Sequence, residues 1–158
     1  MDEKLKRKME IVIGKNQDYY ISKFEVFEKT GNAISWNWAA FSFGIFWMVY
    51  RKMYLFSFVA LVLMSGINIV ETYLHMSHFL DFLLSLWLWV GFGLFGNYLY
   101  YIHIKNKLQE ISKAFPDEKE QEIILAKEGG ISWTAVFLFI FIFLIVSGFL
   151  QSYSNKEF

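Results

Sequence analysis

The sequence predicts an all-α integral membrane protein: three transmembrane helices, a short interfacial or re-entrant aromatic helix, and cytoplasmic amphipathic helices. Two observations support this class. Of the 158 residues, 56% are hydrophobic and 21% are aromatic, which is more than an ordinary soluble fold uses. Charged residues make up 19% of the chain, but they gather before residue 36 and between residues 103 and 130, apart from long uncharged apolar segments.

The three predicted spans cover residues 54–70, 82–102 and 131–150, none of which contains Asp, Glu, Lys or Arg. At a rise of about 1.5 Å per residue, about 20 apolar residues match a hydrocarbon core of roughly 30 Å. A fourth apolar segment, residues 36–50, is shorter. We expect it to lie on the cytoplasmic leaflet or dip into it, and a four-span arrangement in which it also crosses is the alternative.

The distribution of Lys and Arg orients these spans. The first 35 residues hold seven of the fifteen, residues 71–81 hold none, and residues 103–130 hold five. Positively charged loops stay on the cytoplasmic side, so the N-terminus and residues 103–130 are predicted to be cytoplasmic. The loop 71–81 and the tail 151–158 are then external. Four spans would place the five-lysine loop outside, against this rule.

The N-terminal region, residues 1–35, is predicted to be a cytoplasmic amphipathic unit. Its basic start resembles a signal peptide, but the apolar stretch that follows is too short and too polar, so no cleavage is expected. From residue 17 to 29, Tyr20, Phe24 and Phe27 recur at helical spacing, and Gly31 supplies a stop. We expect this apolar face to lie on the bilayer surface or on the other helices.

The cytoplasmic loop 103–130 is predicted to contain two helical pieces. Residues 105–113 continue the second span. Pro116 opens a further helix whose first turn is acidic, which suits the positive end of a helix dipole, and Gly129 and Gly130 end it.

A tryptophan-rich string precedes the first span. It reads Ser35-Trp36-Asn37-Trp38-Ala39-Ala40-Phe41 and continues with Gly44, Trp47 and Tyr50-Arg51-Lys52-Met53-Tyr54. The string resembles the signature of the domain of unknown function 2628 family, and Gly96-Asn97-Tyr98 downstream also fits that pattern. The resemblance implies an uncharacterised multi-pass protein of the bacterial cytoplasmic membrane, and it supplies no catalytic residues.

The same string suggests a binding surface. Trp36, Ala40, Phe43, Trp47 and Tyr50 would share one face of a continuous helix, and the adjoining basic pair could reach phosphate oxygens. The candidate lipid- or partner-binding residues are Trp36, Trp38, Trp47, Tyr50, Arg51, Lys52 and Tyr54. The alternative is an aromatic anchoring belt with charges that only set the topology.

The external loop carries a second candidate site. Glu71, His75, His78 and Asp81 fall at helical spacing and include residue types that bind metal ions or titrate near neutral pH. The alternative is a plain polar turn between two spans.

Within the second span, Gly91, Gly93 and Gly96 match the GxGxxG string of dinucleotide-binding proteins, but no strand precedes them. Glycines in a membrane helix instead allow a neighbouring segment to pack closely, and we interpret them so. Asn97 is expected to hydrogen-bond to another helix or to water.

The remaining chemistry is sparse. The chain has no cysteine, its formal net charge is zero, and no motif for a cofactor or a catalytic group stands out, so neither a cofactor nor a nucleic-acid partner is expected. The leading hypothesis is a non-enzymatic interaction or assembly component. Its partners would be the lipid bilayer, an anionic lipid, a second copy or another membrane protein. The alternative is a transport or sensing protein that uses the external His and carboxylate group.

Overall fold

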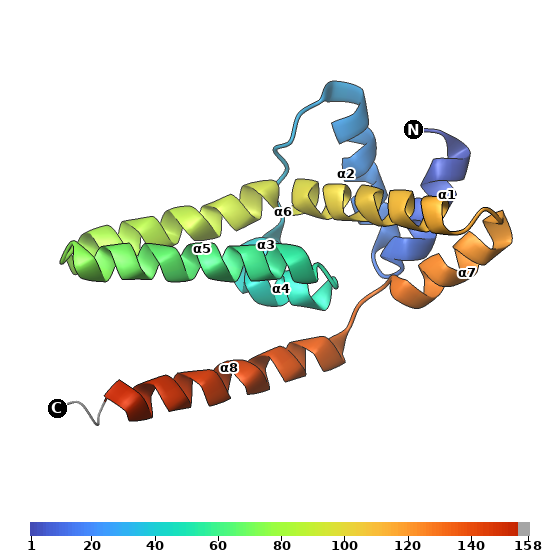
Figure 1. Cartoon of the computed structure of the whole chain (residues 1–158). Helices are drawn as coiled ribbons and strands as arrows, with labels where there is room; N and C mark the ends of the chain where they lie inside the picture. The colour runs from blue at the N-terminus through green and yellow to red at the C-terminus, as the bar shows by residue number, and fades with distance from the viewer. Residues whose placement is uncertain (155–158) are drawn as a thin grey trace.

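The computed structural model describes residues 1–154, and within them all regular structure is helical, without a strand (Figure 1). The predicted all-α class is confirmed. The helices are α1 (Glu3–Ile13), α2 (Gln17–Thr30), α3 (Trp38–Phe43), α4 (Ile45–Tyr50), α5 (Tyr54–Tyr73), α6 (His78–Ala114), α7 (Glu118–Glu128) and α8 (Trp133–Ser154).

Two of these helices, α5 and α6, are long and apolar enough to cross a bilayer. Among the described residues, α7 and Trp133–Gly148 of α8 meet at a bend of 45°. If this bent pair is counted as one segment, it is a third that could cross a bilayer. With 37 residues, α6 is about 55 Å long, so only part of it would fit within a hydrocarbon core of roughly 30 Å.

The helices extend beyond the apolar segments predicted from the sequence. The segment 54–70 is continued to Tyr73, and 82–102 lies inside α6, which also contains the predicted continuation over 105–113. Helix α8 continues to Ser154, into the segment 151–158 that was predicted as an external tail. Residues 155–158 lie outside the described part of the chain.

The helices divide into two groups in space. Figure 1 shows α5, the first half of α6 and α8 extending toward one side, whereas α1, α2, α7 and the end of α6 gather at the other. We call this second group, with α6 from Asn97 onward, the helical unit; its helices contact one another directly. By contrast, α5 and α8 contact the rest of the protein chiefly through α4.

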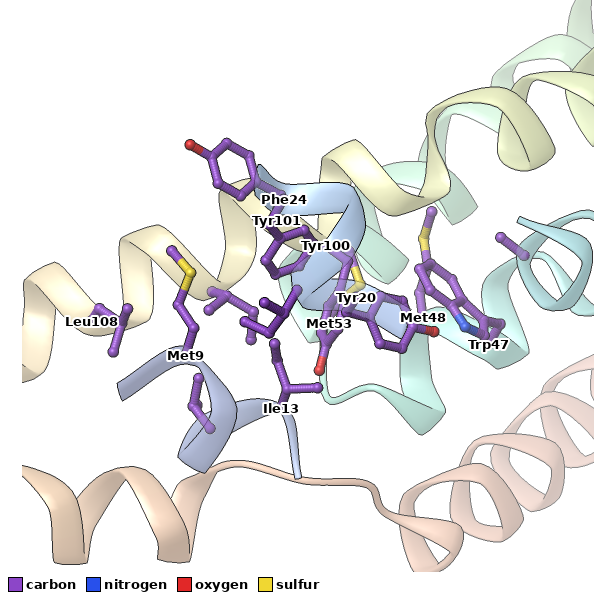
Figure 2. Close-up of a cluster of buried hydrophobic side chains, with 14 of the residues drawn as sticks. Met9, Ile13, Tyr20, Phe24, Trp47, Met48, Met53, Tyr100, Tyr101 and Leu108 are labelled. Carbon is purple, nitrogen blue, oxygen red and sulfur yellow. The ribbon is translucent and has the colours of Figure 1, made fainter. Parts of the chain in front are cut away.

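The core of the helical unit is aromatic where α2 meets α6. The ring centroids of Tyr20 and Tyr100 are 4.8 Å apart, and those of Phe24 and Tyr101 are 5.1 Å apart. Figure 2 shows these rings gathered beside Met9 from α1. The apolar face predicted for residues 17–29 therefore packs on α6, which is one of the two locations expected for it.

Helix α1 was not predicted. It buries Met9, Val12 and Ile13, whose spacing is helical. The resemblance of its basic start to a signal peptide does not reveal this spacing. Ion pairs of Lys4 with Glu118 and Arg7 with Glu122 connect its exposed side to α7.

Helix α7 agrees with its prediction at both ends. The Asp117 carboxylate accepts a hydrogen bond from the Glu120 backbone N–H at 3.0 Å, as a residue preceding the first turn should. At the other end, the Gly129 N–H donates to the Leu125 carbonyl and the helix stops.

The segment 36–50 is not one continuous helix. Gly44 has φ +47° and ψ −119°, a backbone conformation that L side chains rarely adopt, and it separates α3 from α4. The aromatic stripe predicted on one face is therefore wrong: Trp47 is buried, whereas Phe43 is 61% exposed. Helix α3 instead packs along α6.

Candidate functional site

The candidate site lies at the junction between α4 and α5, where Arg51 and Lys52 follow each other. Arg51 is only 3% exposed. Its Nη1 donates to the Lys15 carbonyl at 2.9 Å, and its guanidinium lies 4.5 Å from the ring centre of Tyr20 and 5.3 Å from that of Tyr100. These distances are typical of cation–π contacts. Arg51 thus connects α4, the turn before α2, α2 itself and α6, and it lies inside the protein rather than on its surface.

Lys52 points to a different part of the protein. Its Nζ donates to the carbonyls of Glu128 at 3.2 Å and Gly129 at 2.5 Å. These carbonyls lie at the negative end of the α7 dipole, which favours a cation there. Partial burial, and then the positive charge of Lys107, lower the pKa of Lys52, while Glu128 opposes the shift.

Lys52 and Lys107 both line a basic cleft of about 590 Å³. Lys107 Nζ lies 3.2 Å from a carboxylate oxygen of Glu128 and also donates to the carbonyl of that residue at 3.2 Å. Since one carboxylate opposes two ammonium groups, the charge of the cleft is positive. Its lining includes Lys52, Tyr54, His103, Lys107, Glu128 and Ser132.

His103 contributes an uncharged imidazole to this cleft. Burial, and then the nearby charge of Lys107, lower the pKa of His103 from 6.5 to about 4. The ring can therefore donate one hydrogen bond and accept another at neutral pH.

This lowered pKa predicts a pH dependence of stability. The unfolded chain takes up the His103 proton near pH 6.5, whereas the folded protein resists it until about pH 4, so the free energy of unfolding should fall as the pH drops through this interval. We expect the thermal unfolding midpoint to decrease between pH 7 and pH 5. His103→Gln should remove most of that decrease, and an unchanged slope in this variant would contradict the assignment.

An apolar groove of about 370 Å³ adjoins the cleft. It lies between α4, α5 and α8, and Tyr54 lines both the groove and the cleft. Ser132 joins the end of α4 to the start of α8. Its N–H donates to the Tyr50 carbonyl at 2.9 Å, and its Oγ accepts from the Ala135 N–H at 3.1 Å. The groove lining includes Val49, Tyr54, Leu61, Ala135, Leu138 and Ile142.

The remaining aromatic candidates do not form one surface. Trp38 is 70% exposed and Tyr54 52%, while Trp47 is buried against the core. The Trp36 ring is half-buried, and the Tyr50 ring lies 5.0 Å from that of Trp133. Of the predicted lipid- or partner-binding residues, Lys52 and Tyr54 therefore reach the cleft together, and the others lie elsewhere.

The glycines of α6 differ from one another. A Cβ on Gly93 would lie 2.9 Å from the Trp36 ring, and one on Gly96 would lie 2.6 Å from the Cβ of Ala40. Nothing lies within 4 Å of a Cβ on Gly91. Two of the three glycines thus permit the close approach of α3 and the segment before it, and the third does not contact a neighbour.

A buried polar network holds this contact together. Asn97 was expected to hydrogen-bond to another helix or to water, and its partners are protein groups. Asn97 is fully buried and does not depend on water. Its Oδ1 accepts from the Asn37 side chain at 2.8 Å, and its Nδ2 donates to the Tyr19 hydroxyl and to Ser35 Oγ, both at 3.1 Å. The amide groups are therefore satisfied by each other and by neighbouring oxygens, which indicates a structural role.

The external candidate group is only partly assembled. His78 Nδ1 lies 3.9 Å from a carboxylate oxygen of Asp81, on the first turn of α6, whereas His75 is exposed in the turn before it and Glu71 lies on α5. Among residues 1–154, no three His, Cys, Asp or Glu side chains are grouped closely enough to hold a metal ion.

Comparison with known proteins gives one match. The family model described as "Protein of unknown function (DUF2628)" matches residues 4–105, which extend from α1 well into the second half of α6 and include Arg51, Lys52 and His103. Neither the curated proteins nor the solved structures contain a match to the chain.

Proposed function

Because the chain belongs to the DUF2628 family, whose description assigns no activity, we propose from its physical properties that it is a multi-pass membrane protein acting as a non-enzymatic interaction component. In this proposal α5, the first half of α6 and α8 cross the bilayer. The helical unit lies at the cytoplasmic surface, where it is available to partners.

The observation that carries this proposal is the exposure of large apolar side chains on those three helices. Leu55 of α5 is 73% exposed, Trp87 of α6 is 71% exposed and Phe137 of α8 is 66% exposed. Soluble proteins rarely leave apolar surfaces of such extent in water, so these faces require lipid or a protein partner. The helical unit, in contrast, buries most of its apolar residues internally, with exceptions such as Val26 and Ile123.

Charge supports the orientation. Every Lys and Arg among residues 1–154 lies between residues 4 and 52 or between 105 and 127, whereas the connection between α5 and α6 has none. With the N-terminus in the cytoplasm, three spans satisfy the positive-inside rule. The segment 36–50, broken at Gly44 and packed on α6, would then remain at the cytoplasmic side.

Single-cysteine labelling tests this topology, because the natural sequence has no cysteine to interfere. We expect a membrane-impermeant thiol reagent to label Leu74→Cys in cells whose inner membrane is intact, and to label Lys113→Cys only after that membrane is permeabilised. The opposite pattern would contradict this topology, and with the N-terminus in the cytoplasm it would indicate the four-span arrangement. Extraction of the protein from membranes by alkaline carbonate would reject membrane integration itself.

A further inference from the structure

The basic cleft and the apolar groove are one continuous feature with two chemical halves. Tyr54 lines both. Ser132, immediately before α8, lines the cleft, and Ala135, in the first turn of α8, lines the groove. One end of this feature presents ammonium groups and the other presents aliphatic and aromatic carbon. A ligand that fills it should have an anionic group joined to an apolar chain.

The cleft retains capacity to bind an anion. A lysine ammonium has three donors. Lys52 and Lys107 each use two of them in the contacts described above, so each keeps one. The Glu128 carboxylate is the only acidic side chain that lines the cleft within the described residues, and it neutralises one of the two charges. Helices α5 and α8 both begin here and add the positive ends of their dipoles, beside the negative end of α7, where Lys52 already binds the last carbonyls.

The direction of the groove fits the chain of a lipid. From Tyr54 to Leu61 on α5, and from Ala135 to Ile142 on α8, its lining runs about 10 Å along both helices, away from the cleft. If these helices cross the bilayer as proposed above, the cleft lies at the depth of the phospholipid headgroups. The groove then points into the hydrocarbon region.

We propose that this combined feature binds one anionic phospholipid. Lys52 and Lys107 hold the phosphate, the neutral imidazole of His103 lies beside them, and the groove between α4, α5 and α8 holds an acyl chain. The inference rests on the proposed membrane integration and adds a ligand class to it.

Lipid titration of the purified full chain in a neutral detergent tests the headgroup half. Phosphatidylglycerol is the probe, phosphatidylcholine is the zwitterionic control, and native mass spectrometry reports the bound fraction. We expect a preference for phosphatidylglycerol that Lys52→Gln/Lys107→Gln weakens about twenty-five-fold, because each lysine near an anionic lipid contributes a factor of about five. The matched control, Lys113→Gln/Lys119→Gln, removes two exposed lysines outside the cleft and should retain the wild-type affinity.

A second variant tests the groove. Ala135→Phe should fill the groove near Tyr54 and weaken the binding of long-chain phosphatidylglycerol. Inorganic phosphate, titrated separately, should bind weakly to the wild type and to every variant. Tight binding of inorganic phosphate that Ala135→Phe leaves unchanged would assign the cleft to a free anion and overturn the lipid proposal. A stable dimer that Ala135→Phe dissociates would assign the groove to a second copy, with the same consequence.

The two proposals can fail separately. Equal affinity of the membrane-integrated protein for phosphatidylglycerol and phosphatidylcholine would refute the lipid site alone. Release of the protein by alkaline carbonate would refute the membrane proposal on which the site depends.

Discussion

Arg51→Ala is expected to lower the free energy of unfolding by about 3 kcal/mol. The substitution removes a charged hydrogen bond to the Lys15 carbonyl and leaves the faces of Tyr20 and Tyr100 without their cation. It also leaves a void at a position that is only 3% exposed. Because the residue connects α4 to α2 and α6, the loss should affect the whole helical unit. Thermal unfolding of the purified protein in detergent measures it.

Two further variants separate the origins of this effect. Arg51→Lys keeps the charge but loses the planar guanidinium, so we expect an intermediate loss. Lys52→Gln changes the adjacent, partly exposed residue and should cost less than about 1 kcal/mol. If Arg51→Ala and Lys52→Gln lowered the free energy of unfolding equally, the buried contacts of Arg51 would contribute little to stability.

The different roles of Arg51 and Lys52 could not be predicted from the sequence. Arg51 and Lys52 look equivalent in the sequence, and both were candidates for lipid contact. Their difference arises from the partners that surround them: Tyr20 and Tyr100 enclose Arg51, whereas the end of α7 meets Lys52. Such partners come from distant parts of the chain, so local pattern cannot separate the two roles.

Elements with strong local signals were predicted well. Helix α2 has apolar residues at helical spacing and ends at Gly31, and α7 begins after Pro116 with an acidic first turn. These signals act within a few residues and do not depend on the rest of the fold. The break at Gly44 was missed because a glycine within an apolar run is also compatible with a continuous helix.

The basic cleft was beyond local prediction for a related reason. Lys52 follows α4, His103 and Lys107 lie on α6, and Glu128 ends α7. The sequence places these residues in separate loops and helices, and of the four only Lys52 was predicted to bind a lipid or partner. Helical spacing explains why His103 and Lys107 share a face of α6, but only the packing of α7 and the turn before α5 brings the other two beside them.

Gly129→Ala should be the most damaging of the conservative substitutions. A Cβ at this position would lie 2.7 Å from the Cα of Val12 and would also collide with the Val12 carbonyl oxygen. Both atoms belong to the backbone, so no side chain can turn aside to make room. Gly129 has φ −76°, which suits any residue, and the expected loss is therefore steric rather than conformational.

The consequence should spread from this contact to the whole of α1. The Val12 carbonyl also accepts a hydrogen bond from the Gly130 N–H at 2.8 Å, and displacing α1 would break that bond and expose Met9 and Ile13 to water. We expect a loss of about 3 kcal/mol, at the upper end for overpacking, because the backbone itself must move. Amide hydrogen exchange should show α1 losing protection first.

Gly66→Ala provides the matched control. Nothing lies within 4 Å of a Cβ at Gly66, which is inside α5, so this variant should unfold at the wild-type midpoint or slightly above it. Unfolding of Gly129→Ala at the same midpoint, with α1 still protected, would mean that α1 and α7 are not held together at this crossing. In that case α1 would have to be fixed to the helical unit mainly by its contacts with α2 and α6.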